Sequence, residues 1–332
     1  MSNPERRMLS AALALVGVAT IGLASGEARA QAAKEPPGPV EITSGTSPGG
    51  TPDVLMRRAA KILNEEKIVT QPIVVQNRTG GSWMNAANFV LGKSGDQVTV
   101  LTIAQPILTT PITTGQATVY DKLTPIAMFV QGDLTLAVAA DSPINDLKAL
   151  CEKAKARERS VKVAGAQAGS TDHMVTSLVE KACGAKINYV PFDGGGAATA
   201  AFLGGNVDMI VLPPGEVLPH MKAGKAKPIA LLSEKRRPEP EFKDLKTAKE
   251  QGYDIVWGQS WGLAGPPNTD PALVAFWRDA IAKLVASKAW QDGLSENFQR
   301  SEFDPASDPK AELQKLHEDH LALLKELGLS KL

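Results

Sequence analysis

Short apolar runs rich in β-branched residues alternate along the chain with segments whose apolar positions recur every three or four residues. Residues 40–43 predict a buried strand, and residues 53–64 predict an amphipathic helix with one apolar side formed by Val54, Leu55, Ala59, Ile62 and Leu63. The same reasoning predicts further strands at 72–76, 98–103, 126–130, 135–140, 161–164, 187–191, 207–212 and 228–232, and helices at 83–91, 145–156, 171–183, 197–203 and 216–223. Two or three helices follow to the C-terminus.

Strands that alternate with helices of this length predict an α/β fold with parallel sheets and crossover helices. Gln131-Gly132-Asp133 interrupts the pattern about one third of the way along, and residues 233–240 form a charged, proline-bearing stretch that predicts a surface loop. We therefore expect two α/β domains with two chain crossings. Residues 31–133 and 233–332 form domain 1 in this interpretation, residues 134–232 form domain 2, and the C-terminal helices pack on domain 1.

The N-terminus has the pattern of a signal peptide. Arg6 and Arg7 precede an apolar run over residues 8–24, and Ala28-Arg29-Ala30 has the small-x-small form of a signal peptidase site. We expect residues 1–30 to be removed after Ala30 and the mature chain to be periplasmic. An uncleaved membrane anchor is the alternative, and the arginine pair leaves Sec and twin-arginine export both open.

Composition gives no support to some classes of partner. Lysines plus arginines equal aspartates plus glutamates at 36 each, so the zero net charge does not favour nucleic acid or an anionic membrane surface. The two cysteines, Cys151 and Cys183, are permitted to form a disulfide after export, and the sequence leaves a bridge and two buried thiols equally open. No Cys/His cluster indicates a metal, and we expect no cofactor.

His317 and His320 stand three residues apart near the C-terminus. This is not the His-Glu-x-x-His spacing of zinc proteases. The two histidines are interpreted as part of the solvated face of the predicted helix, because its apolar side is formed by Leu313, Leu316, Leu321 and Leu324.

Two glycine-rich turns each join a predicted strand to a predicted helix. Residues 45–53 read Gly-Thr-Ser-Pro-Gly-Gly-Thr-Pro-Asp, and residues 165–173 read Gly-Ala-Gln-Ala-Gly-Ser-Thr-Asp-His. Such turns leave backbone N–H groups free at a positive helix end, which suits an anion. Neither turn has the nucleotide-binding spacing of glycines. Asp53 either caps its helix or contacts the ligand, and His173 either donates to the ligand or fixes its loop.

An exported hydrolase that uses Ser170 and His173 is the catalytic alternative. The Gly-x-Ser-x-Gly nucleophile elbow is absent around Ser170, so we expect a binding protein and not an enzyme. Arg57, Arg58 and Arg78 have the chemistry to clamp a carboxylate, although surface roles suit Arg57 and Arg58 better.

Several segments, in order, resemble the periplasmic receptors of tripartite tricarboxylate transporters, the Tct/Bug receptors. Gly49, Gly50 and Asp53 resemble the Gly-Gly-x-x-Asp segment of the family, and residues 74–80 resemble Val-Val-x-Asn-Arg-x-Gly. Residues 169–173 are similar to the Gly-x-x-x-His loop, residues 190–194 to Val-Pro-Tyr-x-Gly, and residues 203–208 to Leu-x-Gly-x-Val-Asp.

The resemblance implies a two-domain periplasmic-binding-protein fold of the type II kind, with a ligand cleft between domains that close about a hinge. It implies a di-, tri- or aromatic carboxylate as ligand, membrane permease subunits as partners, and a monomer; a sensory receptor that signals to a kinase is a further alternative. The ligand-binding residues expected on this basis are Thr46, Ser47, Pro48, Gly49, Gly50, Asp53, Gln105, Gln167, Gly169, Ser170, Thr171, His173, Phe192 and Asp208. The sequence departs from the family pattern at positions that concern the identity of the ligand, namely Thr46, Trp83, Gly165, Gln167, Phe192 and Asp193.

Overall fold

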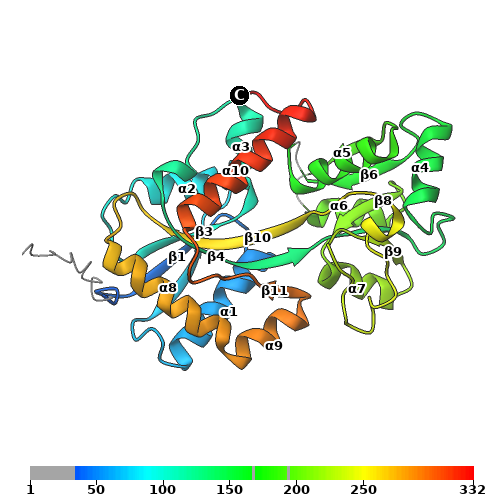
Figure 1. The fold of residues 1–332 in the computed structure, drawn as a ribbon. Coiled ribbons are helices and arrows are strands. Elements are labelled where there is room, and N and C mark those ends of the chain that lie inside the picture. The colour runs from blue at the N-terminus through cyan, green and yellow to red at the C-terminus, as the bar shows by residue number, and fades with distance from the viewer. Residues whose placement is uncertain (1–33, 167–168, 193–194) are drawn as a thin grey trace, which may run out of the picture. The chain divides into compact units, whose positions relative to one another are not determined.

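Two β-sheets, each covered by helices on both faces, organise the chain (Figure 1). We describe the protein from a computed structural model that places residues 34–166, 169–192 and 195–332. The expected signal peptide and Gln167 lie outside these described residues. Residues 34–332 belong to one compact unit, which contains both sheets.

The larger sheet contains six strands in the order β11-β4-β10-β3-β1-β2. Strand β1 pairs in parallel with β2 and β3, whereas β10 runs antiparallel to β3 and β4, and β11 runs antiparallel to β4. The strands are β1 (Val40–Ser44), β2 (Ile73–Asn77), β3 (Thr99–Ile103), β4 (Thr124–Asp133), β10 (Gly258–Gly265) and β11 (Gln299–Ser301).

The smaller sheet contains five strands in the order β7-β6-β8-β5-β9. Strand β6 pairs in parallel with β7 and β8, and β5 runs antiparallel to β8 and β9. The strands are β5 (Thr135–Ala139), β6 (Lys162–Gly165), β7 (Asn188–Pro191), β8 (Met209–Leu212) and β9 (Ala226–Leu231). The α/β class is confirmed, and the expected parallel pairing holds for three strands in each sheet, whereas the remaining strands pair antiparallel.

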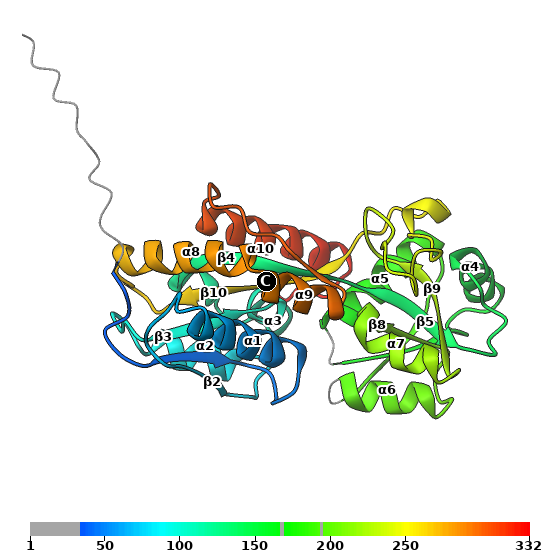
Figure 2. The ribbon, with the colours of Figure 1, turned by 90° about the horizontal axis from the view of Figure 1, so that it is seen from below.

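The antiparallel strands arise where the chain passes between the sheets. Only Leu134 separates β4 from β5, so one extended stretch belongs to both sheets. Figures 1 and 2 show β4 and β10 running side by side toward the smaller sheet, and they are paired over their whole length. Each sheet keeps a parallel unit of three strands, β2-β1-β3 or β7-β6-β8, and in each unit the central strand leads into one of the two glycine-rich turns.

Helices cover both faces of the larger sheet. The larger sheet and these helices form what we call the first half of the molecule. Leu55, Trp277 and Trp290 fill the core under one group of helices, and Ile107 and Leu313 belong to the core under the other. The first group is α1 (Thr51–Glu65), α8 (Pro271–Ala286) and α9 (Lys288–Glu296), and the second is α2 (Met84–Leu91), α3 (Gln105–Thr114) and α10 (Pro309–Glu326). A 3₁₀ turn, η1 (Tyr120–Lys122), precedes β4.

The smaller sheet and its helices form the second half. Leu150 and Val175 pack on one face, and Phe202 and Val217 pack on the other. The helices are α4 (Leu147–Ala156) and α5 (Thr171–Cys183) on the first face, and α6 (Gly195–Leu203) and α7 (Pro214–Lys222) on the second. No helix among the described residues is long and apolar enough to span a membrane.

A disulfide joins Cys151 of α4 to Cys183 at the end of α5, with the two Cα atoms 5.0 Å apart. Both cysteines are buried in the core of the second half. Of the two alternatives that the sequence left open, the structure therefore has the bridge.

The segment after β9 differs from the expected domain boundary. Phe242, Ala248 and Ile255 are buried in the cores of the second half, and the segment contains a second 3₁₀ turn, η2 (Lys249–Gln251). Its first part is also not simply a surface loop, because Arg237 is only 8% exposed. The return crossing therefore lies near Gly258, where β10 begins, and not at residue 233.

The interpretation of His317 and His320 as a solvated face was also wrong. Both are 7% exposed. His317 lies against the ring of Tyr120, with centroids 4.5 Å apart, and His320 meets the edge of Trp257 at 5.3 Å. These aromatic contacts bury the polar rings, and burial lowers the pKa of each histidine despite its backbone contacts to Leu108 or Leu316. The described residues contain no cluster of metal-ligating side chains.

Candidate ligand-binding cleft

A cavity of about 1090 Å³ lies between the two halves and is lined by residues of both. The first half contributes the turns that follow β1 and β2, the exposed side of α3 and the chain after α10. The second half contributes the turn that follows β6, the end of β8 and the start of α7. Both glycine-rich turns therefore meet at one cavity, each at the carboxyl end of a parallel strand, which is where α/β sheets bind ligands.

A buried carboxylate, that of Asp53, fixes the conformation of the first turn. Asp53 is 2% exposed and accepts hydrogen bonds from the N–H of Gly49 at 2.9 Å and from the amide of Asn77 at 2.8 Å, and it pairs with Arg57 at 2.9 Å. Burial raises the pKa of Asp53, but the bonds from Arg57, Gly49 and Asn77 outweigh it and lower the pKa overall. Asp53 thus holds the turn in shape as an ionised group.

The second turn is held by a network of side chains around Tyr189. The tyrosine hydroxyl donates to the carbonyl of Ala166 at 2.6 Å and lies 3.0 Å from Ser170 Oγ. Ser170 is the N-cap of α5, and its hydroxyl accepts from the N–H of His173. His173 stacks on the Tyr189 ring at 4.3 Å, and its Nδ1 accepts from the N–H of Gly169 at 3.1 Å.

This arrangement does not support the hydrolase alternative. Ser170 Oγ faces Tyr189 and the backbone, while the Nδ1 atom of His173 is occupied by Gly169. Burial lowers the pKa of His173, against an opposing effect of Glu180. Serine and histidine therefore stabilise the turn and are not arranged as nucleophile and general base.

Gln105 connects the two halves at the cavity wall. It is the first residue of α3, and its side-chain amide oxygen Oε1 accepts a hydrogen bond from the hydroxyl of Thr171 on α5. Its amide nitrogen lies 2.6 Å from Nε2 of His320 on α10. Beyond Gln105, one side of α3 presents four threonines to the cavity, Thr109, Thr110, Thr113 and Thr114.

Three charged side chains line the cavity among the described residues. Asp172 and Glu216 come from the second half, and Lys331 comes from the chain after α10, where its N–H donates to the carbonyl of Ile112 at 2.8 Å. Burial, together with the charge of Glu216, raises the pKa of Asp172 to about 6 although the N–H of Ala166 donates to it. Glu216 reaches across to the hydroxyl of Thr51 at 3.2 Å.

Comparison with known proteins agrees with this architecture. The profile of the family described as "Tripartite tricarboxylate transporter family receptor" matches residues 55–329. Protein BugT of Bordetella pertussis is 30% identical over 287 residues, which cover 83% of this chain and 85% of BugT. This chain belongs to the tripartite tricarboxylate transporter receptor family.

Solved structures with the fold of this receptor family are also known. A TctC solute-binding protein from Polaromonas, solved without ligand, is 28% identical, and the match covers 88% of this chain and all of that one with a TM-score of 0.71. The protein Rpa4515 of R. palustris, solved with adipate, has a TM-score of 0.77 at 24% identity, covering 90% of this chain and 99% of that one. The second of these shows likeness of fold alone.

The receptor's cavity contains some of the residues expected from the sequence and not others. It is lined by Thr46, Ser47, Gln105, Gly169, Ser170 and Thr171. Gln167 lies outside the described residues. The remaining expected residues are not part of the lining and are Pro48, Gly49, Gly50, Asp53, His173, Phe192 and Asp208.

The last two of these residues have other roles in the receptor. Asp208 pairs with Lys153 at 2.7 Å and accepts from the N–H of Lys162 at 2.8 Å, so it holds the amino end of β6, opposite the cavity. Phe192 packs against the core between the smaller sheet and α6 and α7. We therefore leave Asp208 and Phe192 out of the proposed site.

The three arginines considered as carboxylate clamps also lie elsewhere. Arg57 is bound to Asp53, and Arg58 bonds to the carbonyl of Gly293. Arg78 pairs with Glu41 at 3.0 Å and stacks 3.5 Å from the centroid of the Phe89 ring. None of the three arginines is part of the described cavity lining, which carries hydroxyls, amides and helix ends.

Sequence reasoning expected Gln105 at the cavity but missed the rest of the wall formed by α3. Threonine is a weak helix former and Pro111 lies inside the helix, so no helical pattern was recognised there. Two local signals mark its ends: Pro106 stands in the first turn, and Gly115 follows the last residue with φ 74°. Trp83, noted only as a departure from the family pattern, lines the cavity and packs against Gly45, where an added Cβ would lie 2.5 Å from the indole ring.

Proposed function

We propose that this protein is an exported, periplasmic receptor that captures a small organic carboxylate for the membrane permease of a tripartite tricarboxylate-type transporter. The observation that carries this proposal is the convergence of two glycine-rich turns, each leading into a helix N-terminus, on one cavity between two halves. Helix N-termini favour anions through free N–H groups and the helix dipole. Family membership supports the same role.

Ligand capture is proposed to proceed by closure of two domains. The halves are joined by the β4–β5 stretch and by the entry into β10, and they contact each other across the cavity through Gln105–Thr171 and Thr51–Glu216. A ligand that touches both turns makes contacts in the closed arrangement that it loses in an open one. It therefore shifts the population toward closure by its differential affinity.

The charges of the lining favour a ligand with few negative charges. Asp172 and Glu216 lie on one side, and burial raises the pKa of Glu216 despite its bond from Thr51 and the charge of His220. Lys331 is the one basic side chain among the described lining residues. We propose a mono- or dicarboxylate over a tricarboxylate, because each further carboxylate placed near Asp172 and Glu216 adds like-charge repulsion. The Rpa4515 structure shows that the fold accommodates the dicarboxylate adipate in that protein.

A thermal-shift and calorimetric screen tests this function. Succinate, adipate, malate, citrate and benzoate are the carboxylates, and glucose is the uncharged control. We expect at least one mono- or dicarboxylate to bind more tightly than citrate. Glu216→Gln should reduce this difference in affinity, because the substitution removes one negative charge from the cavity wall. Binding of glucose without binding of any carboxylate would refute the proposal.

Transport is proposed over signalling to a kinase because the family is defined by its transporter. Deletion of the permease genes separates the two roles. Uptake of the bound carboxylate into cells should be lost with the permease, whereas uptake that persists, together with a ligand-dependent kinase response, would assign the protein to signalling.

A further inference from the structure

Both passages of the chain between the two halves meet at one buried carboxylate. Asp133 is the last residue of β4, directly before Leu134 and β5, and it is 4% exposed. Its partner in the sheet is Gly258, the first residue of β10, where the chain returns from the second half. Any rotation of one half against the other must therefore take place around this residue.

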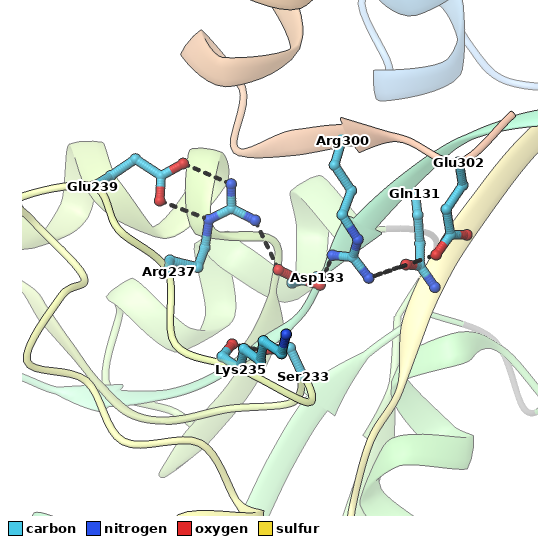
Figure 3. A network of polar contacts seen from close by, with 8 residues as sticks. All are labelled: Gln131, Asp133, Ser233, Lys235, Arg237, Glu239, Arg300 and Glu302. Carbon is cyan, nitrogen blue, oxygen red and sulfur yellow. Dashed lines mark hydrogen bonds and ion pairs between the residues drawn. The ribbon is translucent and has the colours of Figure 1, made fainter.

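Two arginines from different parts of the chain bind the two oxygens of this carboxylate (Figure 3). Arg237 Nη1 lies 2.7 Å from Oδ2, and Arg300 Nη1 pairs with Oδ1. Arg300 is part of β11, which pairs with β4 in the larger sheet. Arg237 comes from the segment after β9 that packs on the second half. Asp133 therefore binds one arginine from each half.

Arg237 is itself held on its other side. Glu239 accepts from Nε at 3.1 Å and from Nη2 at 2.7 Å, in a two-bond contact that fixes the plane of the guanidinium. Burial opposes the charge of Arg237, but the bonds to Glu239 and Asp133 outweigh it and raise the pKa of this arginine. Asp133, Glu239, Arg237 and Arg300 thus form a cluster with two charges of each sign.

An aromatic ring crosses between the halves beside this cluster. Phe298 lies between α9 and β11 of the first half, but it is buried in the core of the second half, where its ring meets the edge of Phe242 at 5.0 Å. The guanidinium of Arg237 lies 5.7 Å from the Phe298 ring. The backbone of Phe298 has φ 55°, a conformation that costs energy for a bulky residue and persists only where the surroundings impose it.

We propose that Asp133, Arg237 and Arg300, together with Phe298, form a pivot that holds the two halves in the ligand-binding arrangement and so sets ligand affinity from outside the cavity. None of the four lines the cavity. An opening rotation that separates Arg237 from Asp133 breaks the buried ion pair that joins the two halves, while Asp133 keeps Arg300 and Arg237 keeps Glu239, so the cluster favours the arrangement in which both arginines are bound to Asp133. Its loss lowers the fraction of binding-competent protein, and apparent affinity falls by that fraction.

Small-angle X-ray scattering of the ligand-free protein tests the pivot without any ligand. We expect Asp133→Asn and Phe298→Ala to increase the radius of gyration relative to the unmodified protein, because both loosen the same connection. Arg300→Met, at a side chain that is 44% exposed, serves if either variant fails to fold, and Arg300→Lys should restore part of the effect. Lys249→Met, which breaks an exposed pair with Glu234 on the segment after β9, is the matched control and should change nothing.

Calorimetry with the tightest-binding carboxylate of the screen gives the second readout. We expect binding at least fivefold weaker in Asp133→Asn, with the control unchanged. A lower melting temperature with unchanged scattering and with affinity within twofold would overturn the proposal, since it would show a structural role alone. Only the calorimetric readout rests on the proposed function. If no carboxylate binds, the proposed function fails, while the scattering measurement still tests the pivot.

Discussion

Asp172 gives the sharpest prediction about stability, because its carboxyl is held in the cavity wall and the N–H of Ala166 is its one hydrogen-bond donor among the described residues. Its pKa is about 6 in the folded protein against an ordinary value of 3.8, owing to burial and to Glu216. The folded state therefore binds the proton more tightly than the unfolded state. The stabilisation is fully present below pH 3.8 and is lost as the pH rises through 6.

The size of the effect follows from the shift. A difference of about 2 pKa units at about 1.4 kcal/mol per unit gives about 3 kcal/mol. We expect the unfolding free energy of the unmodified protein to fall by up to this amount, relative to that of Asp172→Asn, between pH 4 and pH 7. The amide is nearly isosteric with the protonated carboxyl and does not ionise, so it keeps the shape of the turn and removes the pH dependence.

Urea unfolding at several pH values measures this difference. Asp254→Asn, at a side chain that is 93% exposed, is the control and should give a nearly constant difference from the unmodified protein. A difference between Asp172→Asn and the unmodified protein that stays constant from pH 4 to pH 7 would refute the reasoning. It would mean that the carboxyl of Asp172 is hydrated as freely in the folded state as in the unfolded one.

Two further predictions concern the second half. Replacing Cys151 and Cys183 by serine opens a loop with a sequence separation of 32. Urea unfolding should show that the free energy of unfolding falls by about 4 kcal/mol, while calorimetry should show unchanged ligand affinity. An unchanged free energy of unfolding would contradict the stabilising role of the bridge. Gly169→Ala should lower the melting temperature and weaken binding, because φ is +81° and the new Cβ would lie 2.4 Å from Thr113 across the cavity. Gly184→Ala is the control, because Gly184 also has a positive φ, +60°, but open space around an added Cβ. This variant should lose only about 1 kcal/mol of unfolding free energy and no ligand affinity. Equal effects of Gly169→Ala and Gly184→Ala on affinity would show that the contact with Thr113 is unimportant.

Local signals explain why some elements were predicted closely. The sequence predicted helix 171–183, and the structure has α5 over the same residues, because Ser170 caps its start and Gly184 follows its end with φ 60°. The two glycine-rich turns were recognised for the same kind of reason, since strand, turn and helix are adjacent in the chain. Their convergence on one cavity was expected from the family resemblance and could not be derived from local pattern.

Features that depend on distant partners were not predictable from the sequence. In the sequence, Arg237 belongs to a charged stretch, and its hydrogen bond to Asp133, 104 residues away, arises only in the folded chain. His320 reads as a polar position on a helix until Gln105 and Trp257 enclose it. Lys331 and Glu216 gave no motif at all, and only the folded chain places them at the cavity.

A crystal structure of the protein with the tightest-binding carboxylate tests the central claim most directly. We expect the carboxylate in the cavity between the halves, in contact with the first turn near Ser47 and with the second turn near Thr171. A ligand bound elsewhere, or one that contacts only one of the two turns, would contradict the account of two glycine-rich turns that close on one anion.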